Sequence, residues 1–195
     1  MNIGIDIDDT ICNTYETTLP YLKNYMENKL GIQFKMDLSS MVDYYNLASR
    51  FNITREEDMA FWDDYFVKIA EEVKPKENAV EVIRKLKEEG HNIYLVTARF
   101  TVPEIDIKGL TKQWLVNNGI VFDKLIINSH NKLEIAQKEN IDLFFDDSIR
   151  NCSMLSEGNI ETYMYSTEYN EIYKSDKVKR VSSWDEFYRC IKEEK

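Results

Sequence analysis

Cysteine is scarce in this chain of 195 residues, and the three cysteines lie far apart in the sequence. Cys12, Cys152 and Cys190 are odd in number and form no CxxC pair, which fits free thiols of a reducing compartment better than a disulfide framework or a zinc site. No apolar run is long enough to span a membrane. Because a hydrophobic strand begins at once, we also expect no signal peptide. These absences together predict a cytoplasmic protein.

Positive charge is also in deficit, with 25 Lys and Arg residues against 35 Asp and Glu residues, so the formal net charge is −10. This balance excludes a general affinity for nucleic acid polymers or for an anionic membrane surface. It does not exclude a small phosphorylated ligand held in a local site. The length suits one domain with a sizeable core, or one domain that carries an insertion. The oligomeric state is left open.

Short hydrophobic runs alternate with helical periodicity in two parts of the chain, residues 1–11 and 75–195. The predicted strands cover residues 2–5, 92–96, 125–127, 141–145 and 160–165. A helix is predicted before or after each of them, and Ser183 with Glu186 predicts a capping box for the last one. This alternation predicts an α/β protein, a Rossmann-like three-layer α/β/α sandwich with a central parallel sheet.

Residues 12–74 break this alternation. The segment is rich in aromatic residues and helical in period, and it has no convincing strand. Pro75 marks the return to the alternating pattern. The sequence therefore predicts a core of residues 1–11 and 75–195, with residues 12–74 inserted after the first strand as a small helical unit.

Acidic residues crowd the end of the first predicted strand, where Asp6, Asp8 and Asp9 are followed by Thr10. In an open α/β sheet, ligands bind at the carboxyl ends of the strands. Two acids two residues apart can act as a pair, one attacking and one handling protons, and they can hold a hard divalent cation. So many like charges are costly unless a cation is shared among them.

Two later strands also end in polar residues. Thr97 and Arg99 follow the strand 92–96, and Asp146 and Asp147 follow the strand 141–145. Lys132 opens the helix before that last strand. Because the carboxyl ends of parallel strands face one edge of the sheet, we expect these groups to converge with the acids of the first strand.

In this order, the four groups resemble the four motifs of the haloacid dehalogenase (HAD) superfamily of phosphatases and phosphotransferases. The matching residues are Asp6-Ile7-Asp8-Asp9-Thr10, Val96-Thr97-Ala98-Arg99, Lys132 and Phe145-Asp146-Asp147. The resemblance covers the chain except for the insertion, which lies where the superfamily places a type 1 cap. Within the superfamily, the small cap and the Thr97-Ala98-Arg99 sequence look most like the 5′(3′)-deoxyribonucleotidase family.

The resemblance implies a Mg²⁺-dependent phosphomonoester hydrolase that works through an aspartyl-phosphate. Asp6 would be the nucleophile, and Asp8 would protonate the leaving oxygen and later accept a proton from water. The Mg²⁺ ion would be held by a side-chain oxygen of Asp6, the backbone carbonyl of Asp8, and Asp146.

The resemblance also assigns the phosphate contacts. Thr97, Ala98 and Lys132 would bind the phosphoryl oxygens. Asp147 would reach the metal through a bound water. For Arg99 two readings stay open, because it can contact the substrate phosphate or pair with the acidic cluster.

The predicted substrate is a nucleoside monophosphate. A nucleobase needs a flat apolar surface, which the pairs Tyr44-Tyr45 and Phe61-Trp62 can supply. Phe61 and Trp62 are the first candidates, although the same helical spacing also suits a buried helix face.

Alternatives remain. A sugar phosphate or another small phosphorylated metabolite would use the same chemistry. A phosphate-binding protein without catalysis would not need the intact acidic pair. A signalling receiver is disfavoured, because a receiver carries its acceptor aspartate on a later strand than its acidic pair.

Overall fold

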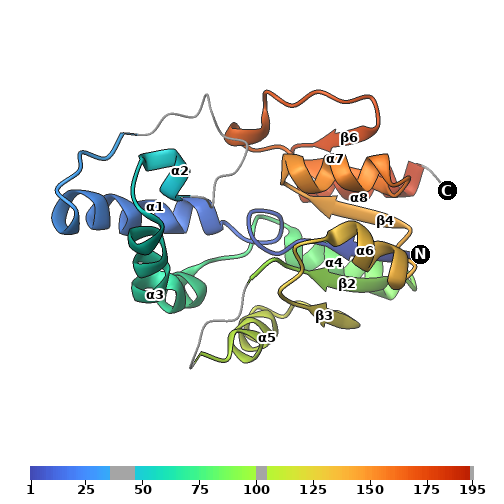
Figure 1. Cartoon of the computed structure of the whole chain (residues 1–195). Coiled ribbons are helices and arrows are strands. Elements are labelled where there is room, and N and C mark those ends of the chain that lie inside the picture. Colours follow the sequence, from blue (N-terminus) through green and yellow to red (C-terminus); the bar gives the residue numbers. More distant parts are fainter. Residues whose placement is uncertain (36–46, 100–104, 194–195) are drawn as a thin grey trace.

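A single parallel sheet of six strands forms the centre of the protein (Figure 1). The computed structural model describes residues 1–35, 47–99 and 105–193. The strand order is β3-β2-β1-β4-β5-β6, and every neighbouring pair is parallel. The strands are β1 (Asn2–Ile5), β2 (Asn92–Val96), β3 (Lys124–Ile126), β4 (Leu143–Asp146), β5 (Glu161–Tyr165) and β6 (Val178–Val181). The predicted parallel sheet is confirmed, and β1 lies near its middle.

Helices cover both faces of the sheet. They are α4 (Ala79–Glu88), α5 (Ile107–Asn117), α6 (Lys132–Lys138), α7 (Ile149–Glu157) and α8 (Trp184–Glu193). One hydrophobic cluster joins α4, α5 and α8 to the first face, and a second joins α6 and α7 to the other. Strand β4 contributes side chains to both clusters, because Phe145 belongs to the first and Phe144, on the opposite face of the strand, belongs to the second. The predicted three-layer α/β/α sandwich is therefore confirmed.

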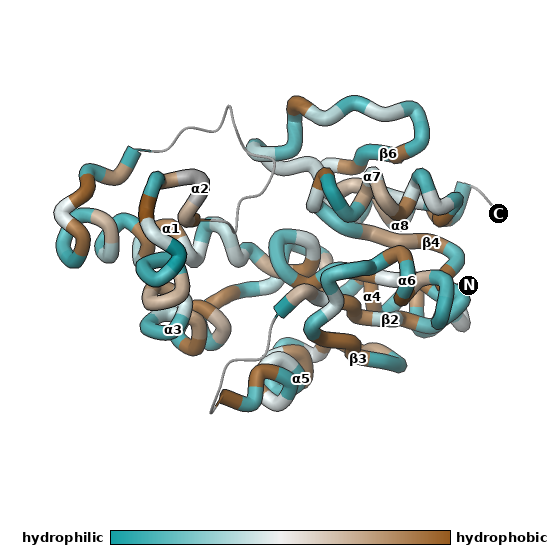
Figure 2. The backbone as a smooth tube through the Cα atoms, in the orientation of Figure 1, coloured by the Kyte–Doolittle hydropathy of each residue, from teal (hydrophilic) through white to brown (hydrophobic). Residues whose placement is uncertain are grey.

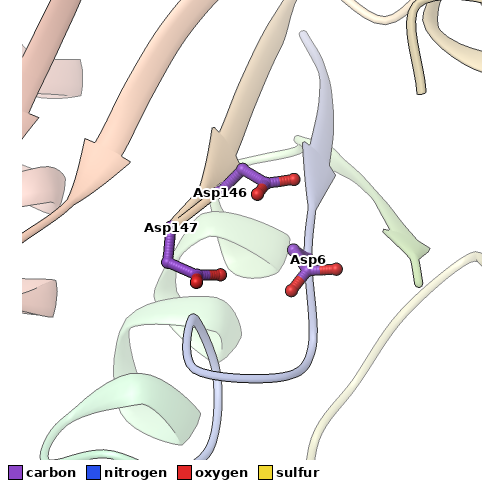
Figure 3. Close-up of side chains that lie close together, drawn as sticks. All are labelled: Asp6, Asp146 and Asp147. Carbon is purple, nitrogen blue, oxygen red and sulfur yellow. The ribbon is translucent and has the colours of Figure 1, made fainter. Parts of the chain in front are cut away.

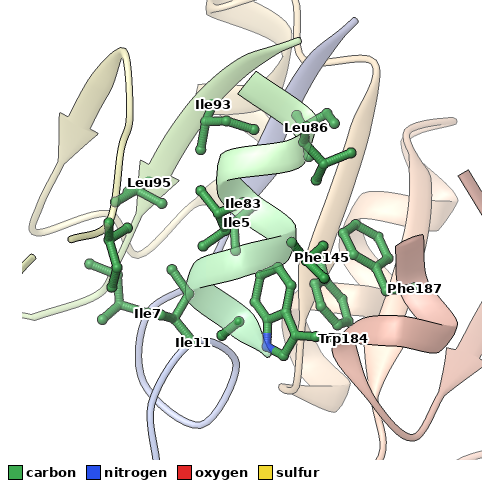
Figure 4. Packing of buried hydrophobic residues seen from close by; sticks show 14 of the residues in the cluster. Ile5, Ile7, Ile11, Ile83, Leu86, Ile93, Leu95, Phe145, Trp184 and Phe187 are labelled. Carbon is green, nitrogen blue, oxygen red and sulfur yellow. The ribbon is translucent and has the colours of Figure 1, made fainter. Parts of the chain in front are cut away.

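The larger cluster packs α4 and α8 against the central strands (Figure 4). Phe145 of β4 stacks on Phe187 of α8, with 4.0 Å between the ring centroids, and Trp184 meets Phe145 edge-on at 5.1 Å. Burying each such side chain contributes about 1.5–3 kcal/mol to folding. Figure 2 shows a hydrophobic stretch in β3, the strand at one edge of the sheet, where Leu125 and Ile126 are half-buried. No described helix has both the length and the apolar character needed to cross a membrane.

The cap helices lie between β1 and β2 in the sequence and beside the sheet in space (Figure 1). They are α1 (Thr14–Asn24), a π-helical turn (Tyr25–Lys29), α2 (Leu47–Phe51) and α3 (Arg55–Glu72). A capping box begins α3, where the Thr54 side chain accepts from the Glu57 N–H and the Glu57 carboxylate accepts from the Thr54 N–H. The cap has its own hydrophobic cluster, centred on Leu22, Tyr25 and Phe61. Its described residues contain no β-strand.

Two chain connections join the cap to the sheet, and they run side by side. The Asn13 N–H donates to the Lys74 carbonyl at 3.1 Å, and the Lys76 N–H donates to the Ile11 carbonyl at 2.7 Å. The Trp114 indole of α5 also donates to the Val73 carbonyl at 2.8 Å. The entry to the cap and the exit from it therefore form one hydrogen-bonded junction.

Two local details differ from the sequence expectations. Strand β6 was not predicted, because its sequence Val178-Lys179-Arg180-Val181 has charges in the middle, as edge strands often do. The capping box of the last helix is only half formed. The Glu186 N–H donates to the Ser183 hydroxyl at 3.1 Å, but the Glu186 carboxylate accepts from the N–H and hydroxyl of Ser182 instead.

Candidate active site

Three aspartates meet where β1 and β4 end (Figure 3). Asp6 follows the last residue of β1, Asp146 is the last residue of β4, and Asp147 comes next. Because β1 and β4 are adjacent and parallel, their carboxyl ends lie side by side. All three side chains are buried, and each offers an oxygen within 4.8 Å of the others. The sheet topology thus gathers the acids of the first and fourth motifs.

Lys132 bridges two of these aspartates. It is 1% exposed, lies at the start of α6, and donates to Asp146 at 2.7 Å and to Asp6. The Asn131 side chain caps the same helix by accepting from the Glu134 N–H, which fixes where α6 begins. Burial alone would lower the pKa of Lys132, but the neighbouring carboxylates of Asp146 and Asp6 raise it. Lys132 is therefore a fixed positive charge in the site.

The charges of this cluster do not balance. If all three carboxylates were ionised, they would exceed the single ammonium of Lys132 by two negative charges in a buried place. Burial raises the pKa of Asp6 to about 8, and the charges of Asp146 and Asp8 add to this effect despite Lys132. Burial, followed by the charge of Asp146, also raises the pKa of Asp147. Closely spaced carboxylate oxygens with an excess of two negative charges suit a hard divalent cation, so the residues present fit such an ion.

Asp8 accepts four hydrogen bonds. Arg99 donates through Nε at 2.9 Å and through a terminal nitrogen at 2.7 Å, Thr14 donates at 2.8 Å, and Thr97 donates at 3.3 Å. Burial would raise the pKa of Asp8, but the Arg99 guanidinium and these hydroxyls lower it below its ordinary value. Arg99 is thus ion-paired with Asp8 of the acidic cluster in this structure.

A short turn after Asp8 links the first motif to the fourth. Asp9 adopts a left-handed backbone with φ of 58°, and its carboxylate accepts from the Tyr15 N–H at 2.8 Å. The Thr10 hydroxyl donates to Asp147 at 3.0 Å, and the Trp184 indole donates to the Thr10 carbonyl at 3.0 Å. Thr10 therefore holds Asp147 in place.

Asp146 is oriented by hydrogen bonds from residues at the start of α7. The Ser148 N–H donates to one carboxylate oxygen at 2.9 Å, and the Asn151 side chain lies 3.2 Å from both oxygens. Sequence reasoning did not find Asn151, although its position in the first turn of α7, just after the Asp146-Asp147 pair, could have suggested it.

A cavity of about 1030 Å³ lies over these residues, between the sheet edge and the cap. The predicted site residues that line it are Asp6, Asp8, Thr97, Ala98, Arg99, Lys132, Asp146, Asp147 and Trp62. The cap contributes a stripe of α3 that begins with Arg55 and Asp58 and continues through Trp62 and Phe66 to Ile69. Sequence reasoning missed Arg55 and Asp58, although their spacing from Trp62 places them on the same helix face. The cavity is thus acidic and hydrogen-bonding at its floor and largely apolar along α3.

The two candidate aromatic residues of α3 have different positions. Phe61 is fully buried, contacts Tyr25 at 5.4 Å between ring centroids, and is not part of the cavity wall. Trp62 is part of that wall. Tyr44 and Tyr45, the other predicted aromatic pair, lie outside the described residues.

Comparison with known proteins agrees with this geometry. The family model described as "5′ nucleotidase, deoxy (Pyrimidine), cytosolic type C protein" matches residues 1–195. A nucleotidase of Clostridium acetobutylicum is 31% identical over 193 residues, which cover 98% of this chain and 93% of that protein. The YqfW protein of Bacillus subtilis is 31% identical over 189 residues, which cover 94% and 90%.

Solved structures share the fold. A predicted phosphatase from Clostridium acetobutylicum superposes with a TM-score of 0.72 at 19% identity, covering 98% of each chain. A haloacid dehalogenase-like hydrolase from Streptococcus pneumoniae gives a TM-score of 0.72 at 12% identity, covering 97% of each. The fold is therefore HAD-like, with cap helices between β1 and β2. Since the family model spans all 195 residues, the chain belongs to the 5′ nucleotidase, deoxy (pyrimidine), cytosolic type C family, and it is a nucleotidase, a hydrolase of phosphomonoesters.

Proposed function

We propose that this nucleotidase releases phosphate from nucleoside monophosphates through an aspartyl-phosphate on Asp6, with Mg²⁺ as its cofactor. The observation that carries the proposal is the pair Asp6 and Asp8 at the end of β1. It lies at the floor of a cavity that is also lined by Lys132 and Asp146. Asp6 is buried and Asp8 is half-buried, and in this structure the pKa of Asp6 is raised while that of Asp8 is lowered. A nucleophile must be ionised and an acid must carry a proton, so these roles require a cation beside Asp6, which would lower its pKa, and the release of Asp8 from Arg99.

In the first step, an Asp6 oxygen attacks phosphorus and the bond between phosphorus and the nucleoside oxygen breaks. Asp8, once it is released from Arg99 and has taken up a proton from solvent, gives that proton to the leaving oxygen. In the second step, Asp8 takes a proton from a water molecule, whose oxygen attacks the phosphorus of the aspartyl-phosphate. Inorganic phosphate leaves and Asp6 is regenerated. Asp8 can do this only when the leaving oxygen or the water replaces one of the donors that now occupy its carboxylate.

Three residues hold the phosphoryl group during these steps. The Thr97 hydroxyl, the Ala98 backbone N–H and the Lys132 ammonium all border the cavity. Donors fixed in place before the reaction stabilise charge that develops on the phosphoryl oxygens. Lys132 is held by two carboxylates, so its ammonium needs little rearrangement during turnover.

The Mg²⁺ ion would be held by the side chains of Asp6 and Asp146 and by the backbone carbonyl of Asp8, with Asp147 contacting it through water. When bound, it would neutralise the repulsion between the Asp6 carboxylate and the anionic phosphate. The excess of negative charge in the buried cluster supports this assignment.

Residues 12–74 are proposed to be the cap, and residues 1–11 with 75–195 the catalytic core. The cap supplies the apolar side of the cavity, and we assign base stacking to Trp62 rather than to the buried Phe61. Base–aromatic stacking is worth about 1–3 kcal/mol.

The direct test is phosphate release from a panel of nucleoside monophosphates and sugar phosphates, with Mg²⁺ and with EDTA. The expected result is Mg²⁺-dependent turnover with a preference for nucleotides, and none with the Asp6→Asn variant. Faster turnover of sugar phosphates would keep the chemistry and overturn the nucleotide assignment. Full activity in EDTA would overturn the metal assignment.

A further inference from the structure

The loop between β5 and β6 reaches into the acidic site from the sheet edge. It contains a short 3-10 helix, Glu168–Asn170, in which Tyr169 is 7% exposed and Asn170 is fully buried. None of the four sequence motifs includes this loop. Its two buried polar side chains both contact Asp147.

Both carboxylate oxygens of Asp147 are held by hydroxyl groups. Thr10 donates to Oδ1 at 3.0 Å, and Tyr169 donates to Oδ2. The two donors come from different segments of the chain, one from the turn after β1 and one from the loop after β5. A carboxylate fixed at both oxygens cannot rotate about its last bond without losing a buried hydrogen bond, which costs about 1–3 kcal/mol.

The loop is itself anchored. The Asn170 side chain donates to the carbonyls of Asp147 and Tyr165, each at 2.8 Å. Arg180 of β6 donates to the side-chain oxygen and to the carbonyl of Asn170, each at 2.7 Å. The Tyr169 ring packs edge-on against Tyr15, with 5.6 Å between the centroids. Tyr169 is therefore a rigid donor and not a loosely placed surface group.

A carboxylate that contacts a metal ion depends on such outer hydrogen bonds for its orientation, and their removal commonly costs 10–100-fold in metal affinity. Asp147 is one of the three buried aspartates whose oxygens lie within 4.8 Å of one another. Any group that sets the direction of the Asp147 carboxylate also sets how that cluster presents its oxygens to a cation.

We propose that Tyr169 is a positioning residue of the divalent-cation site, which acts by orienting Asp147 from the loop between β5 and β6. This inference rests on the proposed function, because it takes Asp6, Asp146 and the Asp8 carbonyl as the residues that hold the cation and Asp147 as the carboxylate that contacts it through water. It adds a fifth segment to the four motifs. It also gives Arg180 and Asn170 a role in fixing that segment.

The experiment measures Mn²⁺ binding to the purified, metal-free protein by the electron paramagnetic resonance signal of free Mn²⁺. Tyr169→Phe removes only the hydroxyl and keeps the ring against Tyr15. We expect the Kd for Mn²⁺ to rise about tenfold or more. The matched control is Tyr163→Phe, which removes a tyrosine hydroxyl on β5 that accepts from the Lys179 ammonium at 3.4 Å. The control should keep the wild-type Kd.

A double-mutant cycle tests whether Tyr169 acts through Asp147. In an Asp147→Ala background, Tyr169→Phe should leave the Kd for Mn²⁺ unchanged. An equal further loss there would overturn the proposal, as would a wild-type Kd for Tyr169→Phe alone. Activity gives a second readout, since the Mg²⁺ concentration for half-maximal activity should rise for Tyr169→Phe while kcat at saturating Mg²⁺ stays near wild type.

The Asp146→Ala variant separates failure of this inference from failure of the proposed function. It should abolish Mn²⁺ binding if the cation lies among the three aspartates. If Asp146→Ala binds Mn²⁺ like wild type, the proposed metal site is wrong. If Asp146→Ala loses Mn²⁺ and Tyr169→Phe does not, only the role of Tyr169 is wrong.

Discussion

Arg99 donates to Asp8 through two of its guanidinium nitrogens, one to each carboxylate oxygen, at 2.9 and 2.7 Å. The proposed acid–base group is thus ion-paired in this state, and the leaving oxygen must compete with Arg99 for the same two atoms. A forked contact of this kind is among the stronger charge-assisted hydrogen bonds in proteins. The pair therefore affects both stability and reactivity.

Arg99→Gln should lower the free energy of unfolding by about 3 kcal/mol near neutral pH, because it leaves Asp8 without its cation. The pair lowers the pKa of folded Asp8, so its stabilisation is present above the unfolded value of about 3.9 and is lost as the pH falls through the lower folded value. Urea unfolding at about pH 6 and about pH 3 should show a smaller difference between wild type and variant at the acid pH. An equal difference at both would contradict the pairing.

Lys132→Met should make stability depend on divalent cations. Without Lys132, Asp6 and Asp146 face each other uncompensated, which costs about 3–5 kcal/mol when one partner of a buried ion pair is removed. Urea unfolding in EDTA should show this loss, and Mg²⁺ should restore part of it. Lys138→Met, at the exposed end of the same helix, is the control and should change little. A loss of equal size with and without Mg²⁺ would argue against a shared cation.

Asp8→Asn should slow turnover strongly and accumulate phosphorylated protein, because the second step loses the base that activates water. Mass spectrometry of the intact protein after mixing with substrate should show one added phosphoryl group. The double variant Asp6→Asn/Asp8→Asn should show none. Phosphorylation that persists in the double variant would place the nucleophile elsewhere.

Trp62→Ala should raise KM for a nucleoside monophosphate about tenfold, in line with the loss of one stacked ring. KM for glycerol phosphate, which has no ring, should stay the same. Phe61→Leu is the matched control: it should lower the melting temperature, because Phe61 is buried in the cap, and should leave the ratio of the two KM values unchanged. If Trp62→Ala raised both KM values by the same factor, the assignment of base stacking to Trp62 would be wrong.

The sequence was sufficient for most of the core. Strand 92–96 was predicted with its observed bounds, and the motif residues Asp6, Lys132 and Asp146 converge as the parallel arrangement requires. Alternating helices and strands predict a parallel sheet, and in a parallel sheet the carboxyl ends of all strands face the same edge. The same alternating pattern therefore predicted both the fold and the edge of the sheet where the site lies.

Other features depend on contacts that local patterns do not encode. Whether Phe61 or Trp62 faces the cavity is decided by how α3 packs on α1, and both residues fit a helical apolar stripe. The hydrogen bonds from Thr10 and Tyr169 to Asp147 join segments that are 137 and 22 residues apart. Side chains of this kind look like ordinary loop residues until the fold brings them together.

The paired junction at Asn13 and Lys74 has a mechanical consequence. Because both connections to the cap are hydrogen-bonded to each other, the chain enters and leaves the cap at one junction, where Trp114 also holds Val73. Thr14 and Tyr15, at the start of α1, extend this junction into the site by donating to Asp8 and Asp9. A rotation of the cap about the junction would move Trp62 and would also strain the hydrogen bond from Thr14 to Asp8. Movement of the cap and the hydrogen bonding of the proposed acid–base group are therefore linked.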